Sequence, residues 1–157
     1  MTSRRGILLA AALAVVLCAS TARAEEEAEL AVLLDAIRAN RKALVAVNLG
    51  LTDEEAKKFW PVYEQYQQQM SAVQDRLVGV IQDYIASFAK MSDEKAMQLV
   101  NRYLAVEAER VQVKQANLPA FAAVLPGRKV ARFYQIENKM DAVVRFDLAE
   151  TIPVVEP

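Results

Sequence analysis

The fold of this chain is decided by residues 52–89, which read TDEEAKKFWPVYEQYQQQMSAVQDRLVGVIQDYIASFA. Apolar and aromatic residues recur in this stretch at strictly alternating intervals of four and three. They are Phe59, Tyr63, Tyr66, Met70, Val73, Leu77, Val80 and Tyr84. This alternation is typical of a coiled-coil helix that buries one narrow seam. We therefore predict one long helix, whose seam is filled either within the chain or by a second chain.

The beginning of this helix carries its own signal. Thr52 can cap the first turn, and Glu55 can reach back to complete a capping box. A helix from Asp53 to about Ala89 would be roughly 55 Å long, whereas a compact globule of this size would be about 36 Å across. We therefore expect an elongated fold. Because the seam continues on both sides of Pro61, we predict a bend there rather than a stop.

Two flanking stretches also have helical periodicity. In residues 26–48 apolar residues recur at intervals of three and four or their sums, and Gly50 fits the left-handed position that follows many helices. Ser92 can cap a third helix, in which Pro119 should introduce a kink or an end. The apolar residues on one face of this third helix are Met97, Val100, Leu104, Val111 and Leu118.

A fourth helix should begin near Pro126 and Gly127 and end near Glu150, before a loose tail at residues 153–157. Its apolar face carries Val130, Phe133, Met140 and Val144. We interpret the scattered methionines, Met70, Met91, Met97 and Met140, as core-filling residues rather than as a soft-metal site. The predicted fold class is all-α, an elongated four-helix hairpin with one long, Pro-bent, heptad-patterned helix.

The N-terminus has the three parts of a secretory signal peptide. Arg4 and Arg5 make it positive, residues 7–18 are apolar, and residues 22–24 (Ala-Arg-Ala) form a cleavage site. The apolar run is shorter than the about 20 residues that span a membrane as a helix. We predict cleavage near Ala24 and a periplasmic mature chain without a membrane span. The paired arginines leave a twin-arginine route open beside the ordinary secretory one.

Removal of residues 1–24 leaves 133 residues, which we assign to one helical domain at residues 25–152 and the tail. Three arginines leave with the signal, so that 16 lysines and arginines face 20 acidic residues, a net charge of −4. This mildly acidic balance argues against nucleic acid or an anionic membrane as the main partner, because both require a concentrated basic surface.

Two missing residue types limit the chemistry of the mature chain. The sequence has no histidine, and its single cysteine, Cys18, lies in the signal. This excludes the commonest general base and the ordinary zinc, copper and nickel sites. The sequence also has no Gly-rich phosphate loop and no G-x-S-x-G motif. We therefore predict a protein that needs no cofactor and is not an enzyme; chemistry with paired carboxylates remains the formal alternative.

Three helix starts share a pattern of apolar residues, and they begin at Leu51, Met91 and Leu125. Ordinary helix-start packing explains this pattern as well as an internal repeat does. The first and the third, LTDEE at 51–55 and LPGRK at 125–129, resemble the L-T-x-x-Q motifs of the Spy/CpxP family of periplasmic stress proteins. The first stretch departs from that motif at Glu55, which stands in place of Gln. The second departs at Pro126, in place of Thr, and at Lys129, in place of Gln.

This resemblance covers the layout from about residue 30 to residue 145, and it implies a four-helix hairpin that pairs into a curved, cradle-shaped homodimer. It also implies ATP-independent binding of unfolding proteins, or tuning of an envelope-stress sensor. The metal-sensing branch of the family uses His, Cys and Met ligands, of which the mature chain lacks the first two. The chaperone's cradle is basic, whereas this mature chain is mildly acidic. Its densest basic-aromatic cluster is Arg128, Lys129, Arg132, Phe133 and Tyr134.

The candidate protein-binding surface is this cluster together with Trp60, which lies off the heptad seam. Its neighbours Phe59, Tyr63 and Tyr66 lie on the seam, and we expect them to be buried. The sequence thus predicts a periplasmic helical binding protein for non-native proteins, either a chaperone or an envelope-stress adaptor. The alternative is a structural or regulatory partner of one envelope protein, such as a sensor or an anti-sigma system, which the seam would bind.

Overall fold

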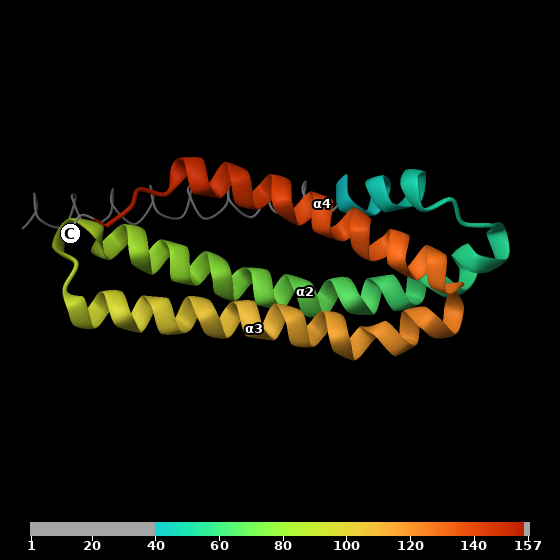
Figure 1. Ribbon diagram of the computed structural model, residues 1–157, viewed down its shortest axis with the longest axis horizontal. Coiled ribbons are helices and arrows are strands. Elements are labelled where there is room, and N and C mark those ends of the chain that lie inside the picture. Colours follow the sequence, from blue (N-terminus) through green and yellow to red (C-terminus); the bar gives the residue numbers. More distant parts are fainter. Residues whose placement is uncertain (1–39, 156–157) are drawn as a thin grey trace, which may run out of the picture. The chain divides into compact units, whose positions relative to one another are not determined.

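The computed structural model describes residues 40–155, and the chain divides into two compact units, residues 1–44 and 45–157. Of the first unit only residues 40–44 are described, and they are helical. The second unit begins with helical residues 45–49. It continues with α2 (Asp53–Ser87), the 3-10 turn η1 (Phe88–Lys90), α3 (Asp93–Val124) and α4 (Gly127–Thr151) (Figure 1).

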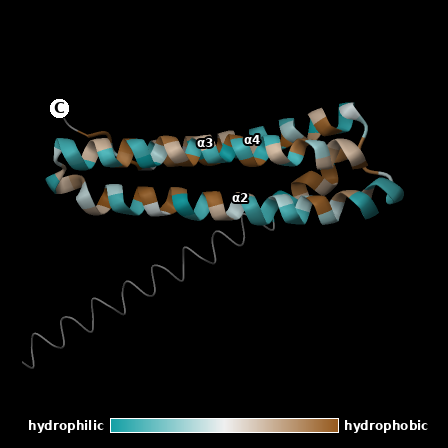
Figure 2. Ribbon diagram, turned by 90° about the horizontal axis from the view of Figure 1, so that it is seen from below, coloured by the Kyte–Doolittle hydropathy of each residue, from teal (hydrophilic) through white to brown (hydrophobic). Residues whose placement is uncertain are grey.

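Residues 40–155 contain helices and no strand, which confirms the predicted all-α fold class. The predicted signal peptide and most of the helix predicted at residues 26–48 lie outside the described residues. Within the second unit, α2 and α3 form an antiparallel hairpin, and α4 runs beside them in the direction of α2 (Figures 1 and 2). The end of α4 therefore returns to the turn between α2 and α3. The predicted homodimer stays a prediction.

The helix ends are stabilised as the sequence indicates. The Thr52 hydroxyl accepts from the Glu55 amide at 3.3 Å, and the Glu55 carboxylate accepts from the Thr52 amide at 2.8 Å, which completes the capping box. At the start of α3, the Ser92 hydroxyl accepts from the Lys95 amide at 3.2 Å. Gly50 follows the helical residues 45–49 with φ +65°, a backbone conformation that favours glycine.

The core of the second unit consists of two clusters of different character. The cluster near the α3–α4 turn is aromatic, and its fully buried rings include Phe59, Tyr63, Tyr66, Phe121 and Phe133. The cluster near the α2–α3 turn is aliphatic and smaller, and its buried members are Val73, Val80, Leu99 and Val106. The seam of α2 thus continues through both clusters, as predicted, and it is filled by α3 and α4 of the same chain.

The apolar face that the periodicity of α3 indicates is exposed to solvent in the structure. Met97, Val100, Leu104, Val111 and Leu118 are all exposed. The prediction that Met97 fills the core is wrong, because its side chain is 60% exposed. The buried residues of α3 are instead Leu99, Val106, Asn117 and Phe121. The helix therefore has two apolar faces, and only one of them packs against α2 and α4.

Both prolines inside helices are accommodated without ending them. Pro61 lies eight residues after the start of α2, which continues to Ser87, so the prediction of no stop is confirmed. Pro119 lies inside α3, which continues to Val124, so the alternative that Pro119 ends the helix is wrong. Each proline is exposed.

Replacement of Pro61 by alanine should stabilise the second unit. An interior proline destabilises a helix by about 3 kcal/mol. Alanine leaves the unfolded chain more conformational freedom, which reduces the gain in folding free energy by about 1 kcal/mol. The net gain of about 2 kcal/mol should raise Tm by about 6–12 °C for Pro61→Ala in thermal unfolding followed by circular dichroism. Pro126→Ala is the control, because Pro126 precedes α4 and interrupts no helix. A lower Tm for Pro61→Ala would contradict the expectation.

Candidate functional site

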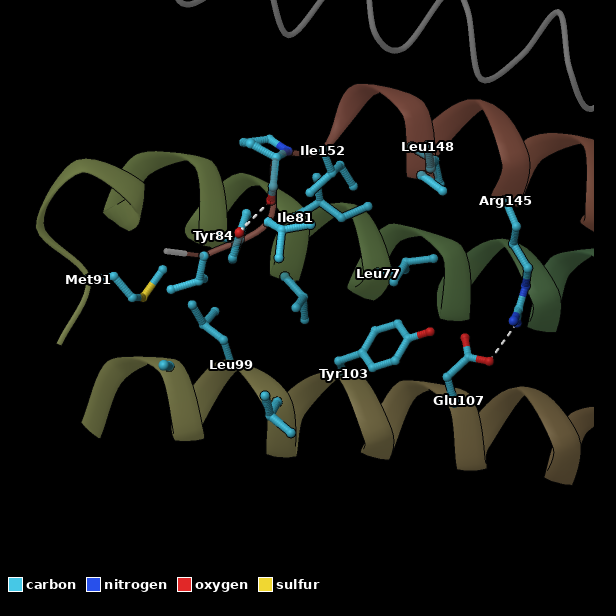
Figure 3. A pocket seen from close by; sticks show the side chains of 17 residues that line it. Leu77, Ile81, Tyr84, Met91, Leu99, Tyr103, Glu107, Arg145, Leu148 and Ile152 are labelled. Carbon is cyan, nitrogen blue, oxygen red and sulfur yellow. Dashed lines mark hydrogen bonds and ion pairs between the residues drawn. The ribbon is translucent and has the colours of Figure 1, made fainter. Parts of the chain in front are cut away.

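The second unit contains a groove of about 590 Å³ near the α2–α3 turn (Figure 3). It is bounded by the last turns of α2, the first half of α3, the end of α4 and residues 152–155. Its volume falls in the range of about 300–1,000 Å³ that is usual for binding pockets. Most of its lining is apolar and includes Leu77, Ile81, Leu99, Tyr103, Leu148 and Ile152.

The groove opens where the aromatic core ends. Near the α3–α4 turn the rings of Phe121 and Phe133, with centroids 4.5 Å apart, fill the space between α3 and α4. In the aliphatic cluster the buried residues join α2 to α3, and no buried residue of α4 belongs to it. The end of α4 therefore lies over the hairpin without filling the space beneath it, and apolar side chains line the groove that results.

Polar contacts connect α4 to α3 between the aromatic core and the groove. Asp141 is buried on α4, and its carboxylate lies 3.0 Å from Lys114 Nζ and 3.7 Å from Arg110 Nη1, both on α3. Closer to the groove, Arg145 of α4 forms an ion pair with Glu107 of α3 at 2.5 Å, and both residues line the groove (Figure 3). The charges of this pair neutralise each other at the inner end of the groove.

A partly buried tyrosine strengthens the same connection. The Tyr134 hydroxyl of α4 donates to the Lys114 carbonyl of α3 at 2.8 Å. Burial raises the pKa of the Tyr134 hydroxyl, with a smaller contribution from the negative charge of Glu137. The hydroxyl therefore keeps its proton and remains a donor at neutral pH.

The chain's own C-terminal segment forms one rim of the groove. After α4 the backbone becomes extended at Ile152, and residues 152–155 all line the groove. The Tyr84 hydroxyl donates to the Pro153 carbonyl at 2.6 Å (Figure 3). The prediction of a loose tail from residue 153 is thus wrong for Pro153, which is anchored to α2. Val154 nevertheless remains 86% exposed.

The two helix starts that resemble each other in sequence meet in the structure. Glu55 and Lys129, the last residues of the stretches 51–55 and 125–129, form an ion pair with each other. Lys129 Nζ also donates to the Gly50 carbonyl at 2.8 Å. Leu51 and Leu125, which begin the two motifs, both pack in the aromatic core. Residues of opposite charge thus join the starts of α2 and α4.

The structure divides the candidate protein-binding surface into unlike parts. Phe133 is fully buried, so its assignment to a surface is wrong; it lies at a position of α4 that faces the core. Trp60 is partly buried and packs edge-on against Phe59 and Tyr63, with centroid distances of 5.1 and 5.4 Å. Arg132 Nε donates to the Asn48 carbonyl at 2.6 Å.

Of the predicted basic cluster, Lys129 and Arg132 thus contact backbone carbonyls at the end of the helical residues 45–49, where positive charge is favourable. Arg128 is exposed on the first turn of α4. The binding role predicted for these three basic residues stays a prediction, and the sequence did not predict the groove. The signal for the groove was the apolar character of Ile152, Val154 and Val155 after the last helix.

Two further properties of residues 40–155 bear on function. Over this range no group of three or more acidic or cysteine side chains is placed to hold a metal ion. None of the helices described combines the length and the hydropathy that crossing a bilayer requires.

The ion pair between Glu55 and Lys129 should make stability depend on pH. The hydrogen bond from Lys129, and then that from Thr52, lower the pKa of Glu55. A lowered pKa contributes stability that is complete above the unfolded pKa and is lost as pH falls through the folded one. Glu55→Gln should therefore lower Tm at pH 7, and the difference from the unmodified chain should shrink below about pH 4.

Thermal unfolding between pH 2.5 and 7 measures this difference. The matched control is Glu54→Gln, because Glu54 is exposed and pairs with Lys57 within the same turn. We expect a much smaller effect from that change, since exposed pairs contribute little. A Tm difference for Glu55→Gln that stays constant across the pH range would contradict the role of the ionised carboxylate.

Comparison of the chain with protein-family models, with curated proteins and with solved structures finds no significant match.

Proposed function

We propose that this chain is an ATP-independent binding protein of the bacterial envelope, a chaperone or stress adaptor of the Spy/CpxP type, which holds apolar segments of non-native proteins. The observation that carries the proposal is the apolar groove near the α2–α3 turn. Non-native proteins differ from native ones chiefly in the apolar segments that they expose, and a groove with apolar walls favours such segments through burial.

Three properties of the groove suit a binding protein better than a catalyst. Its walls come from three helices and are mostly apolar. Its two charged lining residues, Glu107 and Arg145, are paired with each other.

The pairing of Glu55 with Lys129 further supports the resemblance in layout, because the two departures from the L-T-x-x-Q motifs compensate each other.

A different observation favours the alternative function, a fixed partner in the envelope. The exposed apolar stripe on α3, defined by Met97, Val100, Leu104, Val111 and Leu118, has spacings of three, four, seven and seven. It adjoins the groove at Val100, which belongs to both. Such a heptad spacing is typical of a seam that binds another helix with the same repeat. This stripe would bind one amphipathic helix of a sensor or anti-sigma protein, whereas the groove would bind many different segments.

Aggregation of an unfolded client tests the first function. We expect the purified chain to suppress the light scattering of a denatured protein diluted into buffer. Leu148→Asp places a charge in the groove, and we expect it to raise the molar ratio needed for half suppression roughly tenfold, which corresponds to about 1.4 kcal/mol. Absence of suppression by the unmodified chain at molar excess would count against the proposal.

The matched control is Leu104→Asp, which changes an exposed leucine of the stripe that does not line the groove. Circular dichroism and thermal unfolding verify that both variants remain folded. Equal losses of suppression in the two variants would show that the groove has no special part in holding clients.

The same pair of variants tests the alternative function in the opposite direction. If a fixed helical partner binds the stripe, Leu104→Asp should remove one stoichiometric partner from complexes crosslinked in the envelope, whereas Leu148→Asp should retain it. The physical reason is that an aspartate in a heptad seam leaves a charge buried against apolar side chains. Retention of all crosslinked partners by Leu104→Asp would contradict a partner on this face.

A further inference from the structure

We propose that the groove binds an extended apolar peptide segment, and that residues 152–155 are an intramolecular competitor for that site. This inference deepens the proposed function, on which it rests, by naming the substrate class and a regulatory element. The residues of the competitor are Ile152, Pro153, Val154 and Val155, the last described residues of the chain. We expect the segment that displaces them to be apolar and extended, as they are.

The tail shows how a peptide is held at this site. The backbone at Ile152 is extended, with φ −87° and ψ 118°, and the side chain of Ile152 is partly buried in the groove. The Tyr84 hydroxyl donates to the main-chain carbonyl of Pro153. A hydrogen bond to a carbonyl of the backbone can be made to any sequence, whereas the surrounding walls select apolar side chains.

The same hydrogen bond distinguishes a peptide from other apolar occupants. An acyl chain has no carbonyl along its length, so the Tyr84 hydroxyl would lose the partner that it has in Pro153. The tail of a second copy of this chain would also be an apolar peptide segment, so it belongs to the same class of ligand. The paired charges of Glu107 and Arg145 leave the inner end without net charge, which suits an uncharged segment.

The tail is held weakly enough to be displaced. It lines the groove, yet the groove still has about 590 Å³ of free space. Val154 is 86% exposed and Val155 is 40% exposed, so that these side chains bury little of their apolar surface. A segment that fills more of the groove would gain burial that the tail does not have, because the free energy of burial follows the apolar area removed from water.

Fluorescence anisotropy of a labelled peptide tests the competition. The probe is a synthetic peptide with the sequence of residues 151–157, TIPVVEP, and the protein is the full chain. Ile152→Ser weakens the hold of the chain's own tail, and we expect this variant to bind the probe roughly tenfold more tightly than the unmodified chain. The matched control is Ile85→Ser, an exposed isoleucine of α2 that does not line the groove, with no expected change.

A second change tests the hydrogen bond. In the Ile152→Ser background, Tyr84→Phe removes the donor that the probe would use, and we expect its affinity to fall roughly fivefold, the range for one hydrogen bond. Tyr134→Phe in the same background is the control, because it removes a tyrosine hydrogen bond outside the groove. A probe with aspartate at both valine positions should bind to none of these proteins.

The outcomes separate this inference from the proposed function. Equal affinity of the probe for the unmodified chain, Ile152→Ser and Ile85→Ser would overturn the competition. Suppression of client aggregation without any binding of the probe would overturn the peptide site while the proposed function stands. Loss of both would overturn the proposed function as well. Tighter binding of a fluorescent fatty acid than of the probe to Ile152→Ser would show that the occupant is an acyl chain and overturn the inference.

Discussion

The contact between the rings of Phe121 and Phe133 joins α3 to α4 at the place where both meet the apolar seam of α2. Phe59 and Tyr66 of α2 each pack against these two rings. Aromatic side chains fill far more volume than valine, so this cluster holds α4 tightly at one end only. Toward the α2–α3 turn the core becomes aliphatic, and polar side chains such as Asp141 take over the connection to α4. The groove is a consequence of where the aromatic residues stop.

Much of the fold could be predicted from the sequence, because its signals are local. The capping box at Thr52, the left-handed Gly50 and the seam of α2 depend on neighbours within a few turns, and the structure contains all three. The orientation of α3 could not be predicted in the same way. Its two apolar stripes, one through Leu99 and the other through Leu104, both have helical spacing, and only the packing of α2 against one of them decides which is buried.

The candidate site was harder to predict, since its parts are distant in the sequence. The contacts of Lys129 and Arg132 could not be predicted, because their carbonyl partners, at Gly50 and Asn48, lie about eighty residues earlier. The groove depends on a gap between helices, which no periodicity encodes. Its one sequence signal, the apolar tail after α4, has meaning only when the fold brings Pro153 beside Tyr84.

The direct continuation of α4 into the tail has a quantitative consequence. A segment tethered next to its own site acts at an effective concentration of the order of millimolar, which no dilution of the protein can lower. If the groove binds apolar segments as proposed, a free segment would have to compete with the tail at this local concentration before it enters the groove. The tail would thus set a threshold, so that the protein ignores sparse apolar segments and responds when unfolded chains accumulate.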